Sequence, residues 1–529
     1  MTADASTRVL VRLAVRRDRV MLAATTLAIW ILNYYSVVAM RDLYPDRASL
    51  VAANEASNAS PGVVAMYGYV HDTASVGGVG ANKVAMIDMI ALALLVIALV
   101  RRHTRDDEER GRLELLGATP RIRARALWVA VTVAASACVI CGLGSVLSLW
   151  AGGWPLTGSL LLGLAQTGVG LSFTGLAALA MQLSASTRSA SMWAYGALGV
   201  AFLLRMVGDV RWNQPGAALS WLSPLGWAQG ARPYDGNHAW ALPIAPLFCL
   251  LTVAWAARLS ARRDLGAGLL AARPGPGTGR IGTVQGLTWT LQKAPLWGWL
   301  VGYLAFGVLC GAIMGSLRGL ITEDDAQLLR AMGGAGHLDD LYLTLVYAFA
   351  AFGSSAYAVS TVGQLRTEET QGRLEPVLAA PVSRLRYAWS HLGLALCGPV
   401  GLAAALGFGV ASAHVLAGGS SGWWREFSPA LVSLPGIWLI AAIAFLALSW
   451  APRFDWLGWA VLGWVVVVQE LGGLIGLPHR LMELSPFPHL PQRPVDAMTW
   501  PGVIVLCALS ALLIGVAMVG YRRRDMPVG

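Results

Sequence analysis

The chain alternates between long apolar runs and short segments that carry most of its charged residues. The apolar runs are about 17 to 25 residues long, which suffices for a helix to cross a hydrocarbon core of about 30 Å. Backbone groups inside a bilayer must be hydrogen-bonded within the segment, so these runs are predicted to be helices. We expect about twelve membrane-spanning helices, near residues 20–40, 84–100, 127–150, 157–181, 190–208, 241–257, 297–316, 341–362, 388–412, 429–451, 456–475 and 502–521.

Composition supports this all-α, polytopic membrane class. The 529 residues are 56% hydrophobic and 13% charged, with a mean hydropathy of +0.58, well outside the averages for soluble proteins. The first apolar run, 20–40, is too long for a signal-peptide core and no small-residue cleavage site follows it, so it is predicted to be a retained span. The six cysteines all fall in apolar runs, where such thiols usually serve as small hydrophobes, and no metal site is expected.

The net charge of +10 follows from membrane topology. If the N-terminus is cytosolic, the alternating loops place most of the 39 Lys and Arg residues on the cytosolic side, as the positive-inside rule requires. Both termini are then cytoplasmic. We expect a multi-pass protein of the bacterial inner (plasma) membrane that contacts the lipid bilayer and no nucleic acid.

A charged block appears twice, at an offset of 261 residues. RDDEERGRLELLGATPRIRAR (105–125) and RTEETQGRLEPVLAAPVSRLR (366–386) are identical at 10 of 21 positions, and Arg262-Arg263-Asp264 recurs as Arg523-Arg524-Asp525. The chain is therefore predicted to hold two parallel six-span repeats, residues 1–264 and 285–529, joined by a Gly/Pro-rich cytosolic linker, 265–284.

Each repeat is predicted to begin with an elbow helix that lies on the inner leaflet. In the first repeat Arg8, Arg12 and Arg16 recur every four residues, so they share a helix face, as is typical of interfacial basic segments. The counterpart LTWTLQKAPLWGW in the second repeat is less charged.

The charged block lies between the second and third spans of each repeat, on the cytosolic side. No proline interrupts Arg105 to Ala118, which predicts a helix of about 20 Å. Glu108–Arg112 and Glu369–Arg373 have the favourable i,i+4 order for an ion pair on one helix face. Leu113 and Leu374 supply an apolar edge, Pro376 weakens the second copy, and Pro120 and Pro381 are expected to end the two helices.

Two interpretations of this block are open. A charged run is usually a solvated loop. The same charges, glycine and proline nevertheless recur in both repeats while the spans between them have diverged. That recurrence favours a helix through which a soluble partner moves the membrane helices.

The pattern E-x-x-G-R-L-E-x-L-x-x-x-P-x-x-R resembles the cytosolic loop between the second and third helices of ABC-2-type exporter permeases. The double-length form is similar to the fused permeases of high-GC bacteria that export polyketide antibiotics, among them tetronasin-type resistance permeases. The segment RRDLGAGLL (262–270) is a further shared feature. The resemblance implies export of hydrophobic antibiotics or drugs, and it implies coupling to an ATPase through Glu108, Gly111, Arg112, Leu113, Glu114, Pro120, Arg123, Glu369, Gly372, Arg373, Leu374, Glu375, Pro381 and Arg384.

The chain itself lacks the residues that bind ATP. A P-loop requires Lys after Gly, whereas the only two lysines, Lys83 and Lys293, follow Asn82 and Gln292. No enzyme activity and no cofactor are expected in this chain. ATP and Mg²⁺ are predicted to bind to a separate ABC ATPase, in two copies because there are two charged blocks.

Several polar residues lie within the predicted spans, where charges are costly and are usually paired or face a cavity. An ion pair between Asp88 and Arg205 is our hypothesis, either structural or part of an outer gate. Asp209 and Glu470 correspond at the 261-residue offset, and they either line an exit or are ordinary interfacial carboxylates. A polar stripe in the eighth span is a weaker pathway candidate, because hydroxyls in such helices mostly bond to the backbone: Ser354, Ser355 and Tyr357.

Other functions remain open from the sequence. A secondary transporter of the major-facilitator type also has two six-span repeats, but the long Glu-rich loop and the scarcity of deep carboxylates argue against it. A membrane enzyme would need a motif such as HExxH, which the histidines do not form. An exporter of lipids or glycolipids fits the apolar spans as well as a drug exporter does.

Overall fold

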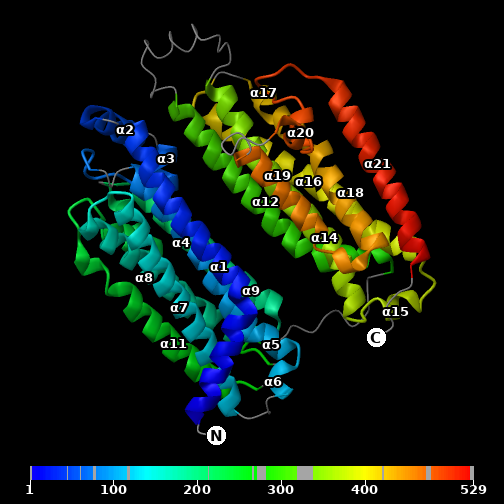
Figure 1. The fold of residues 1–529 in the computed structure, drawn as a ribbon, viewed down its shortest axis with the longest axis horizontal. Coiled ribbons are helices and arrows are strands. Elements are labelled where there is room, and N and C mark those ends of the chain that lie inside the picture. Colours follow the sequence, from blue (N-terminus) through cyan, green and yellow to red (C-terminus); the bar gives the residue numbers. More distant parts are fainter. Residues whose placement is uncertain are drawn as a thin grey trace. The chain divides into compact units, whose positions relative to one another are not determined.

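The computed structural model describes residues 3–44, 46–59, 61–75, 79–115, 120–212, 214–264, 267–270, 282–317, 338–419, 422–471 and 478–524. All regular structure within these ranges is helical, as the hydropathy pattern predicted (Figure 1). Contacts divide the chain into two units, unit 1 (Met1–Gly275) and unit 2 (Pro276–Gly529). Each unit is described by itself.

Unit 1 is a bundle of long helices with short helices at its two ends (Figure 1). Its elements are α1 (Ala3–Leu43), α2 (Arg47–Ala59), α3 (Pro61–Tyr67), α4 (Val79–His103), α5 (Arg105–Glu109), α6 (Arg112–Leu115), α7 (Pro120–Ala151), α8 (Leu156–Leu183), α9 (Thr187–Val210), η1 (Pro215–Leu222), α10 (Pro224–Gly230), η2 (Ala239–Ala241) and α11 (Ile244–Arg262).

Unit 2 is built in the same manner. Its elements are α12 (Val284–Leu317), α14 (Leu338–Thr370), α15 (Glu375–Leu378), α16 (Arg384–Leu416), α17 (Trp423–Phe427), η4 (Ser428–Leu431), α18 (Leu434–Trp450), η5 (Pro452–Phe454), α19 (Leu457–Leu471), α20 (His479–Met482), η6 (Phe487–His489) and α21 (Trp500–Arg523).

Eleven helices in the described residues are long and apolar enough to cross a membrane. Each overlaps one of the spans predicted from hydropathy. The remaining predicted span, 456–475, overlaps α19, which has 15 residues, and residues 472–477 lie outside the described ranges. The chain is thus a polytopic membrane protein.

The first helix of each unit is one continuous helix. The predicted elbow segment and the first span run together as α1, which has 41 residues, and α12 likewise continues for 34 residues. The basic face expected near the N-terminus is solvent-exposed on α1 at Arg8, Arg12 and Arg16.

Close helix packing in both units depends on glycine. In unit 1, α8 packs against α4, α7, α9 and α11. A Cβ on Gly142 of α7 would lie 2.6 Å from the carbonyl oxygen of Gly163 on α8, so the two backbones meet where no side chain fits. In unit 2, a Cβ on Gly307 of α12 would clash with the Leu406 carbonyl of α16. Helices in lipid gain little from the hydrophobic effect when they associate. Small residues at such crossings stabilise the association because they let the two backbones pack closely.

Candidate functional site

A glycine turn divides the repeated charged block into two helical parts in each unit. In unit 1, α5 ends at Glu109 and α6 begins at Arg112, and Gly111 between them has φ +68°. In unit 2, α14 continues to Thr370, Gly372 has φ +67°, and α15 follows. The left-handed conformation explains why glycine occupies this position in both copies. The predicted single helix over 105–118 is therefore wrong, because the turn at Gly111 interrupts it.

Residues 116–119 of the first charged block lie outside the described residues. The backbone places Glu114 in α6, and it places Pro120 and Arg123 in α7, but their side chains are outside what the structure describes. Pro120 is the first residue of α7, where a helix tolerates proline, and the preceding helix already ends at Leu115.

Glu108 is the centre of a buried polar cluster in unit 1. Arg263, which follows α11, binds its carboxylate with both terminal nitrogens, Nη1 to Oε1 at 2.8 Å and Nη2 to Oε2 at 2.9 Å. Arg105 Nη1 reaches Glu108 Oε2 at 3.1 Å. A bidentate arginine–carboxylate pair is the strongest of the common side-chain ion pairs.

The same two arginines tie three segments together. Arg105 donates to the carbonyls of Met181 at 3.1 Å and Ala267 at 3.1 Å, and Arg263 Nε donates to Gln182 Oε1 at 2.7 Å. Helix α5, the end of α8 and the segment that follows α11 are thus fixed to one another. We call these residues the Glu108 cluster: Arg105, Glu108, Met181, Gln182, Arg263 and Ala267.

Unit 2 has a corresponding cluster around Glu369. Arg524, after α21, pairs with Glu369 Oε1, and Tyr521 Oη donates to the same oxygen at 3.0 Å. Arg524 Nη1 also donates to the Leu448 carbonyl of α18 at 3.0 Å. Arg366 lies 3.5 Å from Glu369 Oε2. We call these residues the Glu369 cluster: Arg366, Glu369, Leu448, Tyr521 and Arg524.

The ion pairs predicted within each block do not form. Arg112 pairs with Asp107 at 3.0 Å, and Glu108 turns inward to Arg263. Arg373 pairs with Glu368 at 3.6 Å while Glu369 binds Arg524. The i,i+4 spacing was a poor guide because the glycine turn ends the helix before the arginine.

The remaining block residues divide into an anchor and an exposed surface. Leu113 and Leu374 are buried. The side chains of Arg112 and Arg373 are 46% and 59% exposed. Glu375, Pro381 and Arg384 are also exposed, and Arg384 Nη1 donates to the Arg524 carbonyl at 3.1 Å. Each unit therefore presents charge to solvent from a segment whose base is clamped to the bundle.

A second set of charges joins α1 to the first block. Asp18 is fully buried and pairs with Arg102 at 2.8 Å and with His103 at 2.5 Å. Arg17 pairs with Asp107 at 2.8 Å. In unit 2 the first helix is instead joined to α16 by neutral hydrogen bonds, Thr288 to Ser390 and Gln292 to His391.

The proposed Asp88–Arg205 ion pair is absent from the described residues. Asp88 of α4 accepts a hydrogen bond from Asn33 Nδ2 of α1 at 2.5 Å. Arg205 of α9 pairs with Asp209, one turn later, at 3.4 Å and donates to the Met66 carbonyl at 3.1 Å. Their positions along the predicted spans placed Asp88 and Arg205 at a similar depth in the membrane. In the structure Asp88 bonds to a side chain of a neighbouring helix, and Arg205 pairs with a carboxylate on the next turn of its own helix.

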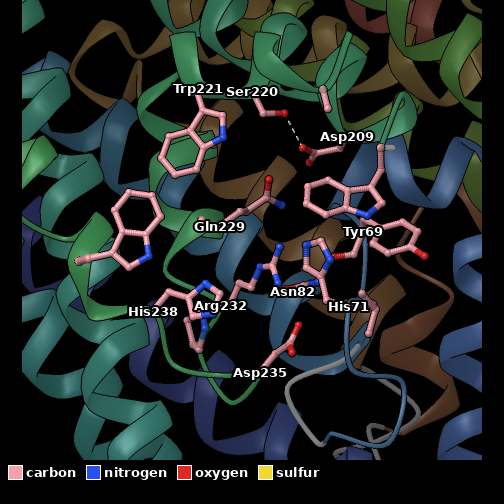
Figure 2. A pocket seen from close by; sticks show the side chains of 17 residues that line it. Tyr69, His71, Asn82, Asp209, Ser220, Trp221, Gln229, Arg232, Asp235 and His238 are labelled. Atoms are coloured by element: carbon pink, nitrogen blue, oxygen red, sulfur yellow. Dashed lines mark hydrogen bonds between the residues drawn. The ribbon is translucent and has the colours of Figure 1, made fainter. Parts of the chain in front are cut away.

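The other pathway candidates have structural partners. Asp209 accepts a hydrogen bond from Ser220 at 2.6 Å (Figure 2). Ser355 donates to the Ala351 carbonyl of its own helix and Ser354 to Tyr303 Oη. Tyr357 is buried and packs edge-on against Trp299. Glu470 lies in α19, but its side chain is outside what the structure describes.

Sequence reasoning missed the partners of the two glutamates. The recurrence of Arg263 as Arg524 was visible, but their contacts to Glu108 and Glu369 span 155 residues and leave no local pattern. Asn33, Gln182 and Tyr521 carried no signal of their own. No group of His, Cys, Asp and Glu suited to a metal ion occurs among the residues whose placement is described.

The chain aligns over almost its whole length with a known protein. It is 36% identical over 528 residues to the multidrug efflux system permease protein Rv1217c of Mycobacterium tuberculosis (strain ATCC 25618 / H37Rv), an alignment that covers 98% of this chain and 94% of the relative. Residues 281–522 match the family described as multidrug efflux system permease Rv1217c, C-terminal domain.

Proposed function

This chain belongs to the family of the multidrug efflux system permease Rv1217c, and from that premise we propose that it is the permease subunit of an ABC-2-type exporter. In this proposal it lies in the bacterial plasma membrane with both termini in the cytoplasm. It exports hydrophobic antibiotics or drugs with energy from two copies of a separate ABC ATPase, which carries the ATP and Mg²⁺.

The observation that carries the proposal is the paired arrangement of the charged blocks. Each block exposes an arginine, Arg112 or Arg373, at the end of the bundle where the second and last long helices of its unit meet. Exposed charge on a rigid base is what an electrostatically guided partner needs.

The buried clusters explain how a docked partner could act on the membrane. A push on α5 and α6 is passed through Glu108 and Arg263 directly to the end of α11 and, through Arg105, to the end of α8. In unit 2 the route runs through Glu369 and Arg524 to α18 and α21. A partner that binds to the block therefore displaces several helices together and not a single loop. Rigid helices joined by polar contacts can carry such coupling between distant sites.

The first test is composition of the purified complex. We expect the chain, expressed with the ABC ATPase encoded nearest to its gene, to purify with two ATPase copies per chain. Hydrolysis of ATP by this complex should increase when a lipophilic drug is added. A one-to-one ratio contradicts the two-site arrangement, and purification with no ATPase favours a secondary carrier.

The second test separates docking from folding. The double variant Arg112→Glu and Arg373→Glu should lose the ATPase while the chain stays folded, since both side chains are largely solvent-exposed. Arg453→Glu is the matched control, because Arg453 is exposed on η5, the segment that follows α18 at the same end of unit 2. Equal loss of the ATPase in the control would show that general charge, and not the two blocks, governs association.

The substrate class can be tested in the same cells. A strain that expresses the chain and its ATPase should tolerate lipophilic antibiotics better than a strain with the double variant. If only the lipid or glycolipid composition of the envelope changes, the chain exports lipids and not drugs.

A further inference from the structure

Unit 1 contains a pocket at the end of its bundle opposite to the charged block. It lies where α9 ends and α4 begins, beside α10 and the loop that leads to α11, and it has a volume of about 270 Å³. Ligand pockets usually measure about 300–1,000 Å³. This one therefore suits a small molecule or one ring-bearing part of a larger one.

Aromatic rings form two walls of this pocket. Tyr69 and Trp212 stack with ring centroids 5.7 Å apart and planes inclined by 18°. Trp221 and Trp240 stack likewise, 5.3 Å apart and inclined by 18°. Figure 2 shows Tyr69 on one side and Trp221 on the other, with Gln229 and Arg232 between them. Facing aromatic walls favour a flat, aromatic ligand.

Arg232 supplies a cation to this pocket. Its guanidinium lies 5.4 Å from the centre of the Trp212 ring, and in the described part of the chain it makes no side-chain hydrogen bond or ion pair. Asp209 is already engaged by Arg205 and Ser220. Asp235 is attracted by the nearby charge of Arg232, but burial raises the pKa of its carboxyl above the usual value, so this carboxylate is a weakened counter-charge.

The loop that carries Arg232 is held in an unusual conformation. Arg232, Tyr234 and Asn237 have φ of +44°, +65° and +52°, a region that side chains other than glycine seldom adopt. Tyr234 anchors the loop by a 2.8 Å hydrogen bond to Ser159 and by its carbonyl, which accepts from Ser75 at 2.6 Å. Strained backbone of this kind gathers at ligand sites, where it fixes a side chain in place.

Gln229 adds a second polar group. Its Nε2 donates to the Tyr67 carbonyl at 2.9 Å, whereas its buried Oε1 has no hydrogen-bond partner among the described residues. A buried acceptor without a partner costs free energy unless a ligand or water supplies a donor.

We propose that this pocket binds an aromatic acid, either as a small molecule or as one end of a larger ligand. The ring lies between the two tryptophan-bearing walls, the acidic oxygen binds the Arg232 guanidinium, and a hydroxyl or N–H donates to Gln229 Oε1. This binding site goes beyond the transport role proposed above, and it requires neither the ATPase nor turnover.

The corresponding place in unit 2 lacks this chemistry. At the 261-residue offset, Gln229 is replaced by Leu490 and Gly226 by Phe487, and both replacements line a pocket of about 200 Å³ in unit 2. Arg493 corresponds to Arg232, but it donates to the Asp496 carbonyl at 3.4 Å. The site for an aromatic acid is therefore assigned to unit 1 alone.

The test is equilibrium binding to the full chain in nanodiscs of phosphatidylcholine, a zwitterionic lipid, at pH 7.4. The probes are 6-hydroxy-2-naphthoate, whose hydroxyl supplies the donor for Gln229 Oε1, and its uncharged analogue 6-hydroxy-2-naphthamide, titrated by calorimetry; they are called naphthoate and naphthamide below. We expect saturable one-to-one binding of naphthoate. The variant Arg232→Asn should weaken it about 10- to 100-fold, which is the usual worth of a hydrogen bond to a charged group. It should leave the weaker binding of naphthamide unchanged.

Controls make the outcomes decisive. Asparagine tolerates positive φ, so Arg232→Asn keeps the loop conformation, and Arg493→Asn is the matched variant in unit 2. Trp240 is 63% exposed, so Trp240→Leu should fold and weaken both probes. The proposal fails if naphthoate does not bind saturably, if naphthamide binds equally well, or if Arg493→Asn has the effect expected of Arg232→Asn.

Discussion

The two charged clusters each centre on a glutamate and an arginine at corresponding positions of the two units, but they differ in what surrounds this pair. In unit 1 two arginines share Glu108, and Arg105 is fully buried. In unit 2 Arg366 and Arg524 likewise share Glu369, a tyrosine hydroxyl is added as a third partner, and the side chain of Arg366 stays 24% exposed. A repeated motif thus fixes the central ion pair, whereas the helices around it set how strongly each unit depends on that pair.

The largest expected difference between the units comes from removing the central carboxylate. Glu108→Gln leaves Arg105 and Arg263 buried without their shared counter-charge, and breaking a buried pair costs about 3–5 kcal/mol. Glu369→Gln should cost less, about 3 kcal/mol at the lower end of this range, because it leaves Arg524 buried while Arg366 is partly solvated. Thermal unfolding in detergent, followed by intrinsic fluorescence, would measure both.

Glu55→Gln serves as the control for this comparison, since Glu55 is exposed on α2. It should change the unfolding temperature little. Equal losses from Glu108→Gln and Glu369→Gln would contradict the difference between the clusters, and no loss in either would remove the clusters as structural clamps.

A second difference concerns charges inside the helices. Asp88, Arg205 and Asp209 belong to unit 1, and at the 261-residue offset Phe349 and Val466 stand in place of the first two. We expect Arg205 and Asp209 to be coupled by about 0.5–3 kcal/mol in a double-mutant cycle that uses Arg205→Met and Asp209→Asn. Arg205→Met and Asp88→Asn should be additive within about 0.5 kcal/mol, since the two side chains share no partner. Coupling of Asp88 to Arg205 as strong as that of Asp209 would restore the ion pair inferred from sequence depth.

The third prediction concerns a feature that the units share. Gly111→Ala and Gly372→Ala should each lower the free energy of unfolding by about 1–2 kcal/mol, the cost of a Cβ in the left-handed region. A Cβ at Gly372 meets nothing within 4 Å, so the loss there comes from the backbone alone. Replacement by asparagine should cost less at both sites, and thermal unfolding of the four variants measures it. A loss in one unit only would mean that the turns differ.

The sequence predicted the features that repeat or that have a fixed period. Apolar runs located the helices because a helix that crosses the membrane needs a continuous apolar run. The repeated block located both glutamates and both glycines. It did not show that Gly111 adopts positive φ, because a glycine within charged residues also fits a helix. It did not pair Glu108 with Arg263, since such contacts depend on how helix ends meet and not on spacing. Similarly, depth along a helix could not decide between Asp88 and Asp209 as the partner of Arg205, because depth does not specify which way a helix face points.

The smallest expected effect is a change in how the stability of unit 1 depends on pH, and it arises at His71 in the pocket of that unit. Burial, helped by the nearby charges of Arg232 and His238, lowers the pKa of His71 to about 4 from its usual 6.5. The unfolded chain therefore binds a proton at His71 before the folded chain does, so the stability that depends on neutral His71 is lost as pH falls from 6.5 to about 4. His71→Gln should reduce the fall in unfolding temperature over this window. At pH 7.5 both proteins should respond to pH alike, because the histidine is then neutral in both states. Burial raises the pKa of Asp235 in the same pocket, so the folded chain binds that proton more readily than the unfolded chain and Asp235 contributes stability as pH falls, with the opposite sign to His71. Asp235→Asn should therefore make the fall in unfolding temperature steeper. A fall that is unchanged by His71→Gln would show that His71 does not cause the pH response.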